Sequence, residues 1–398
     1  MQYRDNDIVI LAGARTPFGN FGGVLRDLTA TDLGVAAAKG AIARSGVPAE
    51  KIDDVVFGNV VQTSVDAIYL ARHVGLRAGL PVGVPALTVN RLCGSGLQAI
   101  ISAAQHLLLG EAMYVLAGGT ESMSQAPHVI RGARWGLGLG QGKLEDALWE
   151  ALTDSYNAMS MAITAENLAE RYHLSREVSD EFALRSQQNA VAAQDSGYFA
   201  EEIVAVEVPG AKGAVQVVDR DEGPRDGLSM ERLAKLPARF KKGGVVTPGN
   251  ASGITDGAAA VVLTTVKQAK ADGLSWIGRL VSWSTVGVDP DIMGIGPAVA
   301  IPKALQRADV QLRDLRVIEI NEAFAPQVLA CATEIGLDGA RLNPHGGAIA
   351  LGHPLGASGA RIAYTALHDL RSHGGGYGVA SACIGGGQGI AAVVEAAE

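Results

Sequence analysis

Short apolar runs alternate with longer amphipathic runs along most of the chain. Strand-like runs at residues 53–60, 86–90 and 113–119 are separated by helix-like runs at 31–46 and 95–110. Buried strands appear as nearly continuous apolar runs, whereas helices repeat apolar positions every three to four residues. The alternation predicts βαβ units, and therefore an α/β fold with a mostly parallel, buried sheet.

A similar order of elements returns near the C-terminus. An offset of 263 positions places Ala41–Gln62 on Ala304–Ala325 with the apolar positions in step. Without a gap, the same offset places Ser95-Gly96 on Ser358-Gly359, each at the start of a helical pattern. Self-similarity at a fixed offset indicates a repeated structural unit. We therefore expect two similar α/β halves, with helix N-termini related by a pseudo-twofold axis.

The middle of the chain differs from both halves, because it carries more charge, Met and Tyr and long helical runs. Long insertions at sheet edges commonly build binding sites. We predict an N-terminal half over residues 1–120 and an inserted loop domain over 121–250. The first half is then expected to return over 251–273, and the C-terminal half to cover 274–398.

Composition narrows the class of protein. The 398 residues are 48% hydrophobic, include 51 glycines, and carry a formal charge of −8 without a long basic run. A nucleic-acid partner therefore has little support. The apolar run at the N-terminus is too short for a signal peptide or a membrane span. Three cysteines are too few and odd in number for a disulfide framework, so we expect reduced thiols in an intracellular protein.

Cys93 lies in the stretch TVNRLCGSGLQAI, between a short apolar run and a helical pattern. A lone cysteine is more often a small buried hydrophobe than a nucleophile. At a helix N-terminus, however, free N–H groups and the helix dipole stabilise a thiolate and lower the thiol pKa. Gly94 and Gly96 would let a substrate approach the backbone closely. On this stretch alone, both interpretations stay open.

The loop NPHGGAIALGHPLGASG contributes two histidines. His353 lies between a glycine and a proline just before a helical pattern, where a pinned backbone favours a general base. His345, earlier in the same loop, is the competing candidate and fits a structural role better. The residues themselves do not separate the two.

Two strand ends carry further candidates. In SACIGGGQG, Cys383 ends a predicted strand and meets three glycines, whose amides could form an oxyanion hole beside a second acid/base thiol. In EINEAFAPQ, Asn321 and Glu322 end an apolar strand, the usual location of site residues in open α/β sheets. Asn321 could equally cap the next helix. Cys331 falls within an apolar helical run and is interpreted as core.

Taken together, these four motifs resemble the thiolase family over essentially the whole chain. GARTPFG, GGTESMS, VTPGNASGITDGAAA and MGIGP also match, and their joint order is far more specific than any one of them. DAIYLARHVGLRAG and SACIGGGQG are most similar to the mitochondrial type of 3-ketoacyl-CoA thiolase and its bacterial relatives. The resemblance implies a layered αβαβα fold and a homotetramer built from two dimers.

The resemblance also implies a catalytic role for each matching residue. Cys93 is the nucleophile that becomes acylated, His353 takes its proton, and Cys383 is the second acid/base thiol. Asn321 holds a water that joins His353 in stabilising the oxyanion of one thioester. The amides of Cys93 and Gly385 form a second oxyanion hole.

For coenzyme A, the resemblance implies contacts from Arg225 and from Ser252 of NASG. Lys235 and the Lys241-Lys242 pair are further cationic candidates, although a solvated surface explains them better. One departure concerns Ser160-Met161, where thiolases dedicated to joining two acetyl-CoA molecules usually carry His-Met. The absence of that histidine favours a broader substrate range, and Met161 is still able to narrow the acyl pocket.

The implied reaction is the reversible CoA-dependent cleavage of a 3-ketoacyl-CoA to acetyl-CoA and a shortened acyl-CoA, as in fatty-acid β-oxidation. It follows ping-pong kinetics, with coenzyme A as co-substrate and no permanent cofactor or metal. The main alternative is a biosynthetic acetoacetyl-CoA thiolase. A ketoacyl synthase-like enzyme, a silent acyl-CoA-binding protein and a cysteine hydrolase are weaker alternatives, since none of them uses every motif. We expect a cytoplasmic protein, with the mitochondrial matrix left open.

Overall fold

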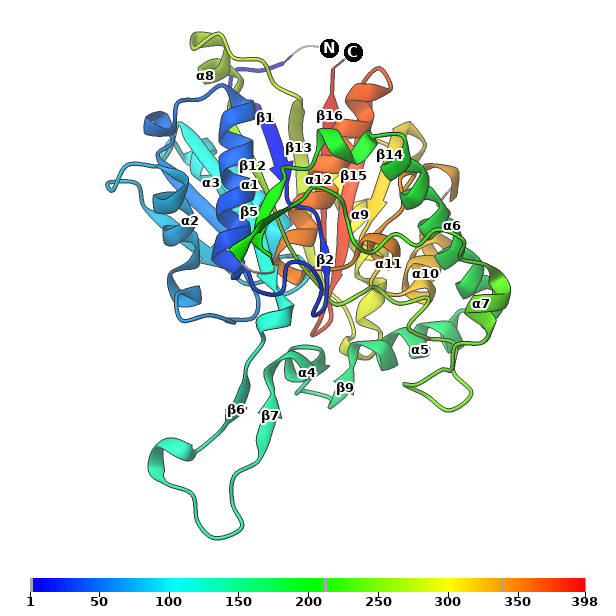
Figure 1. The fold of residues 1–398 in the computed structure, drawn as a ribbon. Helices are drawn as coiled ribbons and strands as arrows, with labels where there is room; N and C mark the ends of the chain where they lie inside the picture. Colours follow the sequence, from blue (N-terminus) through cyan, green and yellow to red (C-terminus); the bar gives the residue numbers. More distant parts are fainter. Residues whose placement is uncertain (1–2, 211–212, 338, 398) are drawn as a thin grey trace.

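The computed structural model describes residues 3–210, 213–337 and 339–397 (Figure 1). Its main sheet has ten strands in the order β14-β15-β16-β13-β1-β12-β5-β3-β4, with β2 paired to β12. The first half contributes β1 (Ile8–Arg15), β2 (Gly19–Asn20), β3 (Asp54–Gly58), β4 (Ala86–Val89), β5 (Tyr114–Ser122) and β12 (Thr255–Thr265). The second half contributes β13 (Gly278–Gly287), β14 (Leu315–Ile320), β15 (Gly376–Ile384) and β16 (Gln388–Ala396).

The repeat predicted from the sequence is confirmed by matching helices. In the first half these are α1 (Ala30–Ser45) and α3 (Ser95–Leu109), and in the second α9 (Gly296–Ala308) and α12 (Leu355–Ser372). The last residues of α1 and α9, and those of α3 and α12, are related by the same offset of 263 positions. Strands β1 and β13 pair antiparallel through residues 8–10 and join the halves.

Three apolar cores separate the layers of the fold. Helices α3 and α12 pack in one core against side chains from both halves of the sheet. On the outer faces, α1 and α2 (Leu70–Ala78) cover the first half, and α9 and α10 (Ala325–Ile335) cover the second. Strand β1 shows the alternation, because Ile8 and Ile10 face the inner core and Val9 and Leu11 an outer core. The result is the expected αβαβα arrangement.

The expectation of a mostly parallel sheet is wrong. Only β3–β4, β3–β5 and β14–β15 pair parallel in the main sheet, and the other ladders are antiparallel. The last strand of each half is inserted between two strands that come earlier in that half: β12 lies between β1 and β5, and β16 lies between β13 and β15. Continuous apolar runs report burial on both faces and carry no information about strand direction.

The segment between β5 and β12 forms several small units rather than one core. Its elements are β6 (His128–Ile130), β7 (Leu144–Asp146), α4 (Ala147–Ala151), β8 (Thr153–Asp154), β9 (Met159–Ser160), α5 (Met161–Arg171), α6 (Arg176–Asp195), β10 (Val206–Pro209), β11 (Val215–Val218) and α7 (Met230–Ala234). Figure 1 shows the β6–β7 hairpin extending away from the body. Two short helices, α8 (Val266–Ala271) and α11 (Ala348–Leu351), complete the chain. One window, Leu92–Leu109, is long and apolar enough to span a membrane, but it covers the inner-layer helix α3.

Candidate active site

The two inner helices cross at their first turns. A Cβ atom on Gly96 would lie 2.6 Å from the backbone nitrogen of Ala360, and one on Gly359 would lie 2.4 Å from that of Leu97. The offset of 263 positions relates the two contacts, because it pairs Gly96 with Gly359 and Leu97 with Ala360. Only glycine permits backbones to approach so closely. The two helix starts therefore meet, in agreement with the expected pseudo-twofold relation, and Cys93 and His353 each precede one of those helices by two residues.

Cys93 lies in a largely apolar pocket at the start of α3. Its side chain is 9% exposed and packs in a cluster with Val61, Met123, Leu148 and Leu355. Burial raises the pKa of the Cys93 thiol to about 11, although N–H groups of residues 385 and 93 hydrogen-bond to the sulfur and oppose that rise. Desolvation of the thiol therefore outweighs the lowering of the pKa that the helix start favours. Cys93 therefore rests as a neutral thiol.

His353 is a buried, neutral imidazole with a defined hydrogen-bond pattern. Ser358 Oγ donates to the Pro354 carbonyl at 3.1 Å, so it is free to accept from His353 Nδ1 at 2.6 Å. This assigns the proton to Nδ1 and leaves the Nε2 lone pair to accept from Asn321 Nδ2 at 3.3 Å. Burial, aided by the positive charge of Arg361, lowers the pKa of His353 to about 3. A neutral ring whose Nε2 is unprotonated is the form that can accept a proton, and the 3.3 Å contact from Asn321 must give way when it does so.

Replacing Ser358 by alanine should lower kcat about tenfold, because the Nδ1–H of His353 would lose the acceptor that the described residues give it in a buried site. Steady-state assays with the substrate that the family resemblance implies will measure the effect. Ser284→Ala is the matched control, because Ser284 is equally buried and donates to a backbone carbonyl of Ala300 in α9. Equal losses in both variants would show that a buried hydroxyl matters only for folding.

Asn321 lies directly after β14 with its side chain beside His353. Its backbone N–H donates to Ser381 O at 2.9 Å, which fixes it against β15. The helix-cap alternative is wrong, since α10 begins at Ala325 and its N-cap residue is Phe324. Among the described residues, Asn321 Oδ1 is buried without a hydrogen-bond partner. That oxygen is an acceptor available to a water or a substrate.

Cys383 ends β15 and is fully buried. Burial, together with the negative charge of ionised Cys93 and Cys331, raises the pKa of the Cys383 thiol well above its usual value. Its apolar neighbours include Met161, which also lies against the next turn, because a Cβ on Gly385 would be 3.2 Å from the Met161 sulfur. The structure thus brings both thiols, the Gly385 amide and Met161 together.

Ser160 precedes α5 and makes no side-chain cap to it. It is partly buried and pairs with Thr153 in the short β8–β9 ladder. Its neighbour Met161 is the residue that reaches the Cys383 cluster. The pair therefore lies at the edge of the site, with only Met161 placed in contact with it.

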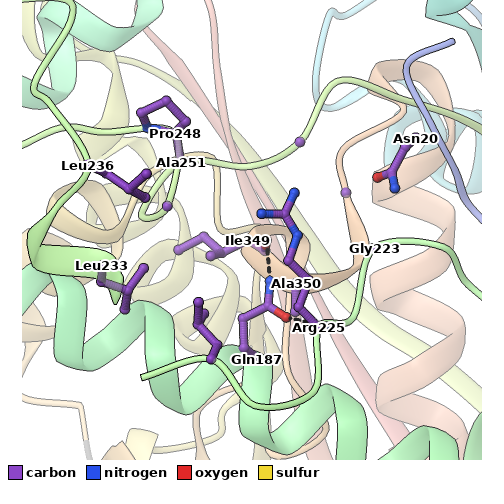
Figure 2. Close-up of a pocket in the computed structure, with 14 residues that line it drawn as sticks. Asn20, Gln187, Gly223, Arg225, Leu233, Leu236, Pro248, Ala251, Ile349 and Ala350 are labelled. Carbon is purple, nitrogen blue, oxygen red and sulfur yellow. Dashed lines mark hydrogen bonds between the residues drawn. The ribbon is translucent and has the colours of Figure 1, made fainter. Parts of the chain in front are cut away.

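A pocket lies beside the loop that leads to His353 (Figure 2). Arg225 and Gln187 line it side by side, and the Arg225 N–H donates to Gln187 Oε1 at 2.9 Å. Ser252 sits between two lining residues, and its N–H donates to Ala323 O. The adjacent Gly253 carbonyl accepts from the His353 N–H at 3.0 Å. The pocket wall is therefore continuous with the backbone of the candidate base.

Two candidates lie outside this site. His345 bonds through Nε2 to Asp369 at 2.6 Å and stacks on Tyr198 at 3.7 Å. Asp369 lies fourteen residues along α12 from Leu355, or roughly 20 Å at 1.5 Å per residue, so His345 serves the far end of the helix. Cys331 is buried in α10, where its thiol donates to Gly294 O and burial raises its pKa to about 12.

The cationic candidates of the insert take surface positions. Lys241 is ion-paired with exposed Glu170, and Lys235 follows α7 at the surface. Among the residues that the structure describes, no group of three His, Cys, Asp or Glu side chains is arranged to hold a metal ion.

The sequence alone did not assign a supporting role to Ser358 or Glu121. Ser358 orients His353, and Glu121 accepts four hydrogen bonds close to Cys93. Glu322, a candidate from its position at a strand end, anchors the histidine loop, because it accepts from Asn343 Nδ2 and the Ile349 N–H. The same signal, a charged residue near the end of an apolar strand, also applies to Glu121.

Comparison with known proteins agrees with this arrangement. The family profile "Thiolase, N-terminal domain" matches residues 8–267 and "Thiolase, C-terminal domain" matches 274–396. The chain is 52% identical to the human "3-ketoacyl-CoA thiolase, mitochondrial" over 389 aligned residues, and the alignment covers 98% of each chain. It is 49% identical over 386 residues to the "Acetyl-CoA acetyltransferase" of Pseudomonas aeruginosa, which covers 97% of this chain and 98% of that protein.

The crystal structure of human mitochondrial 3-ketoacyl-CoA thiolase in complex with CoA superimposes with a TM-score of 0.96 at 51% identity, covering 99% of each chain. The fold and these matches define an acyltransferase. The chain belongs to the thiolase family, whose characterised chemistry uses coenzyme A as a substrate rather than as a permanent cofactor.

Proposed function

We propose that this protein catalyses the reversible thiolytic cleavage of 3-ketoacyl-CoA to acetyl-CoA and an acyl-CoA shortened by two carbons. The observation that carries the proposal is the cluster of Cys93, Cys383 and the Gly385 amide at the start of α3. Beside it, α12 begins two residues after the neutral base His353. Degradation of fatty acids by β-oxidation fits the relatives named 3-ketoacyl-CoA thiolase.

The first half-reaction forms an acyl-enzyme. As the Cys93 sulfur bonds to C3 of the substrate, the thiol proton passes to His353 Nε2. The C2–C3 bond breaks, and the acetyl-CoA enolate takes its proton from the Cys383 thiol. The Gly385 N–H and Asn321, through a bound water, stabilise the negative oxygens that develop. The second half-reaction transfers the acyl group to coenzyme A, whose thiol proton returns to Cys383 while His353 reprotonates Cys93.

Replacing Cys383 by alanine should block release of acetyl-CoA while still permitting attack by Cys93, because only the enolate loses its proton donor. We expect steady-state thiolysis to fall by roughly 10²-fold or more. Rapid-quench mass spectrometry should still detect a covalent adduct on Cys93. Unchanged turnover in this variant would remove Cys383 from the mechanism.

Coenzyme A is proposed to enter the pocket lined by Arg225, with Ser252 at its edge. An exposed guanidinium can pair with phosphate groups through charge-assisted hydrogen bonds. Arg225→Ala should raise the KM for coenzyme A roughly tenfold with a small change in kcat. Arg220→Ala is the control, because Arg220 is an exposed arginine of the same segment. An unchanged KM would place the phosphates elsewhere.

The substrate range is proposed to be broad, over short and medium acyl chains. Ser160 stands where dedicated acetoacetyl-CoA thiolases usually carry histidine, while Met161 restricts the space next to Cys383. Thiolysis rates for 3-ketoacyl-CoA substrates of four to sixteen carbons, about the usual range, will test this. Activity confined to the four-carbon substrate would favour the alternative, a biosynthetic acetyl-CoA C-acetyltransferase. The relative named acetyl-CoA acetyltransferase, which is 49% identical, supports that alternative.

We further propose that residues 121–250 form an insert within the first half, between residues 1–120 and 251–273, and that this insert binds coenzyme A and the acyl group. A homotetramer is proposed because the β6–β7 hairpin projects from the body with Trp135 and Leu139 almost fully exposed. Light scattering on the intact protein will measure its mass.

A cytoplasmic location is proposed from the bacterial relatives. The mitochondrial relatives make the matrix the alternative, and cell fractionation will distinguish the two.

A further inference from the structure

Glu121 is a fully buried carboxylate near the end of β5 whose two oxygens accept four hydrogen bonds. Oε1 accepts from Asn59 Nδ2 and the Val61 N–H, both at 3.0 Å. Oε2 accepts from the Val60 N–H at 3.1 Å and the Gly356 N–H at 2.9 Å. Three donors belong to the loop after β3, and the fourth is the second residue of α12. One side chain thus joins the two halves of the protein.

The groups held by Glu121 surround the candidate nucleophile. Val61, which donates to Glu121, packs in the same apolar cluster as Cys93. Leu355, also in that cluster, immediately precedes Gly356 and lies two residues after His353. The carboxylate therefore ties one wall of the Cys93 pocket to the helix that begins beside the candidate base.

The internal repeat shows that this contact exists in one half alone. The offset of 263 positions pairs Cys93 with Gly356 and Glu121 with Ile384. At the start of α12 a carboxylate receives a backbone N–H, whereas at the start of α3 the equivalent side chain is apolar. A Cβ on Gly94 would lie 2.6 Å from Ile384 Cδ1. The N-cap residue of neither helix makes a side-chain cap, so within the described residues it is the bond from Gly356 N–H to Glu121 that distinguishes the start of α12. The partial positive charge at the N-terminus of α12 is compensated by Glu121, whereas the one at the N-terminus of α3 acts on Cys93.

We propose that Glu121 is a positioning residue that fixes the start of α12 against the Cys93 pocket. Because it compensates the N-terminus of α12, the N-terminus of α3 is the one whose partial positive charge remains to act on Cys93. The effect of Glu121 on turnover rests on the proposed thiolase function. An ionised carboxylate is required for this role, since only it offers acceptors to four N–H donors. A glutamine would direct its NH₂ group at the two donors that now share one oxygen, and both would lose their acceptor in a buried site.

Glu121→Gln tests the proposal with two readouts. The first is the pH dependence of Cys93 alkylation by iodoacetamide, followed on the Cys93 peptide by mass spectrometry and independent of any CoA substrate. The second is the kcat and KM of thiolysis. The titratable groups next to these two residues are Cys383 beside Cys93 and Asp256 near Glu121, and both are kept as in wild type.

We expect the alkylation midpoint of Glu121→Gln to move to lower pH, because a negative charge near the thiol is removed, and kcat to fall about tenfold with KM changed less than about threefold. The control is Glu395→Gln, another buried carboxylate, ion-paired with Arg279 at the other end of the sheet. It should lower the melting temperature without moving the alkylation curve. Glu121→Asp keeps the charge but retracts it, so its midpoint should stay near wild type while kcat falls.

An alkylation curve and a kcat equal to wild type in Glu121→Gln would overturn the proposal, as would equal effects in Glu395→Gln. If Glu121→Gln does not fold, Glu121→Asp carries the test, and unchanged kcat in that variant has the same meaning. A wild-type protein that cleaves no 3-ketoacyl-CoA would refute the proposed function instead. The alkylation curves would still report on Glu121 in that case.

Discussion

Replacing Cys93 by alanine should abolish thiolysis, with kcat/KM falling roughly 10⁴-fold or more. No other thiol can take over, since Cys331 is buried in α10 and Cys383 faces the site from a separate turn. Cys93→Ser should be nearly as inactive, because a hydroxyl is a far weaker nucleophile at neutral pH. Steady-state assays over a range of enzyme concentrations will measure the loss.

Cys331→Ala is the matched control for that prediction, because it removes a buried thiol from the core of α10. It should lower the melting temperature and leave kcat/KM within about twofold of wild type once the folded fraction is equal. Substantial thiolysis by Cys93→Ala, or its loss in Cys331→Ala at full folding, would assign the chemistry to another residue.

Replacing His353 by alanine should lower the rate of acylation by about 10³-fold at pH 7. The Cys93 thiol is neutral with a pKa of about 11, so without a base only its small thiolate fraction reacts. In the variant, the residual rate should therefore rise about tenfold per pH unit between pH 7 and 9. Wild type should be much flatter over that range, because the pKa of His353 is about 3 and the ring stays neutral.

The same substitution at His345 is the control, since that side chain bonds to Asp369 at the far end of α12. His345→Ala should alter stability and keep the wild-type pH dependence of acylation. A residual rate in His353→Ala that does not change with pH would mean that Cys93 is already ionised at rest. That result would replace proton transfer to His353 by a preformed thiolate.

The repeat was the part of the fold most accessible from sequence. Helix, strand and turn patterns kept one offset over both halves, and the offset placed Gly96 on Gly359. Because those two glycines are where the inner helices cross, the sequence already contained the contact that brings the two helix starts together. The positions before those helices made Cys93 and His353 candidates, and their roles as nucleophile and base came from the family resemblance, because the motifs alone left alternatives open.

Strand direction and electrostatics were not accessible in the same way. An apolar run signals burial equally in parallel and antiparallel strands, so β12 and β16 could not be oriented from sequence. The thiol pKa of Cys93 depends on how much water the folded pocket excludes, which local motifs do not report. Glu121 and its partner Gly356 are 235 residues apart, so only the tertiary structure joins them.

The most direct test of the account is to identify the residue that carries the acyl group. The intact protein is incubated with a 3-ketoacyl-CoA in the absence of free coenzyme A, quenched in acid, digested and analysed by peptide mass spectrometry. The account predicts an acyl adduct on the peptide containing Cys93, which disappears when coenzyme A is added before the quench. An adduct on Cys331 or Cys383, or no adduct from a protein that turns over substrate, would contradict it.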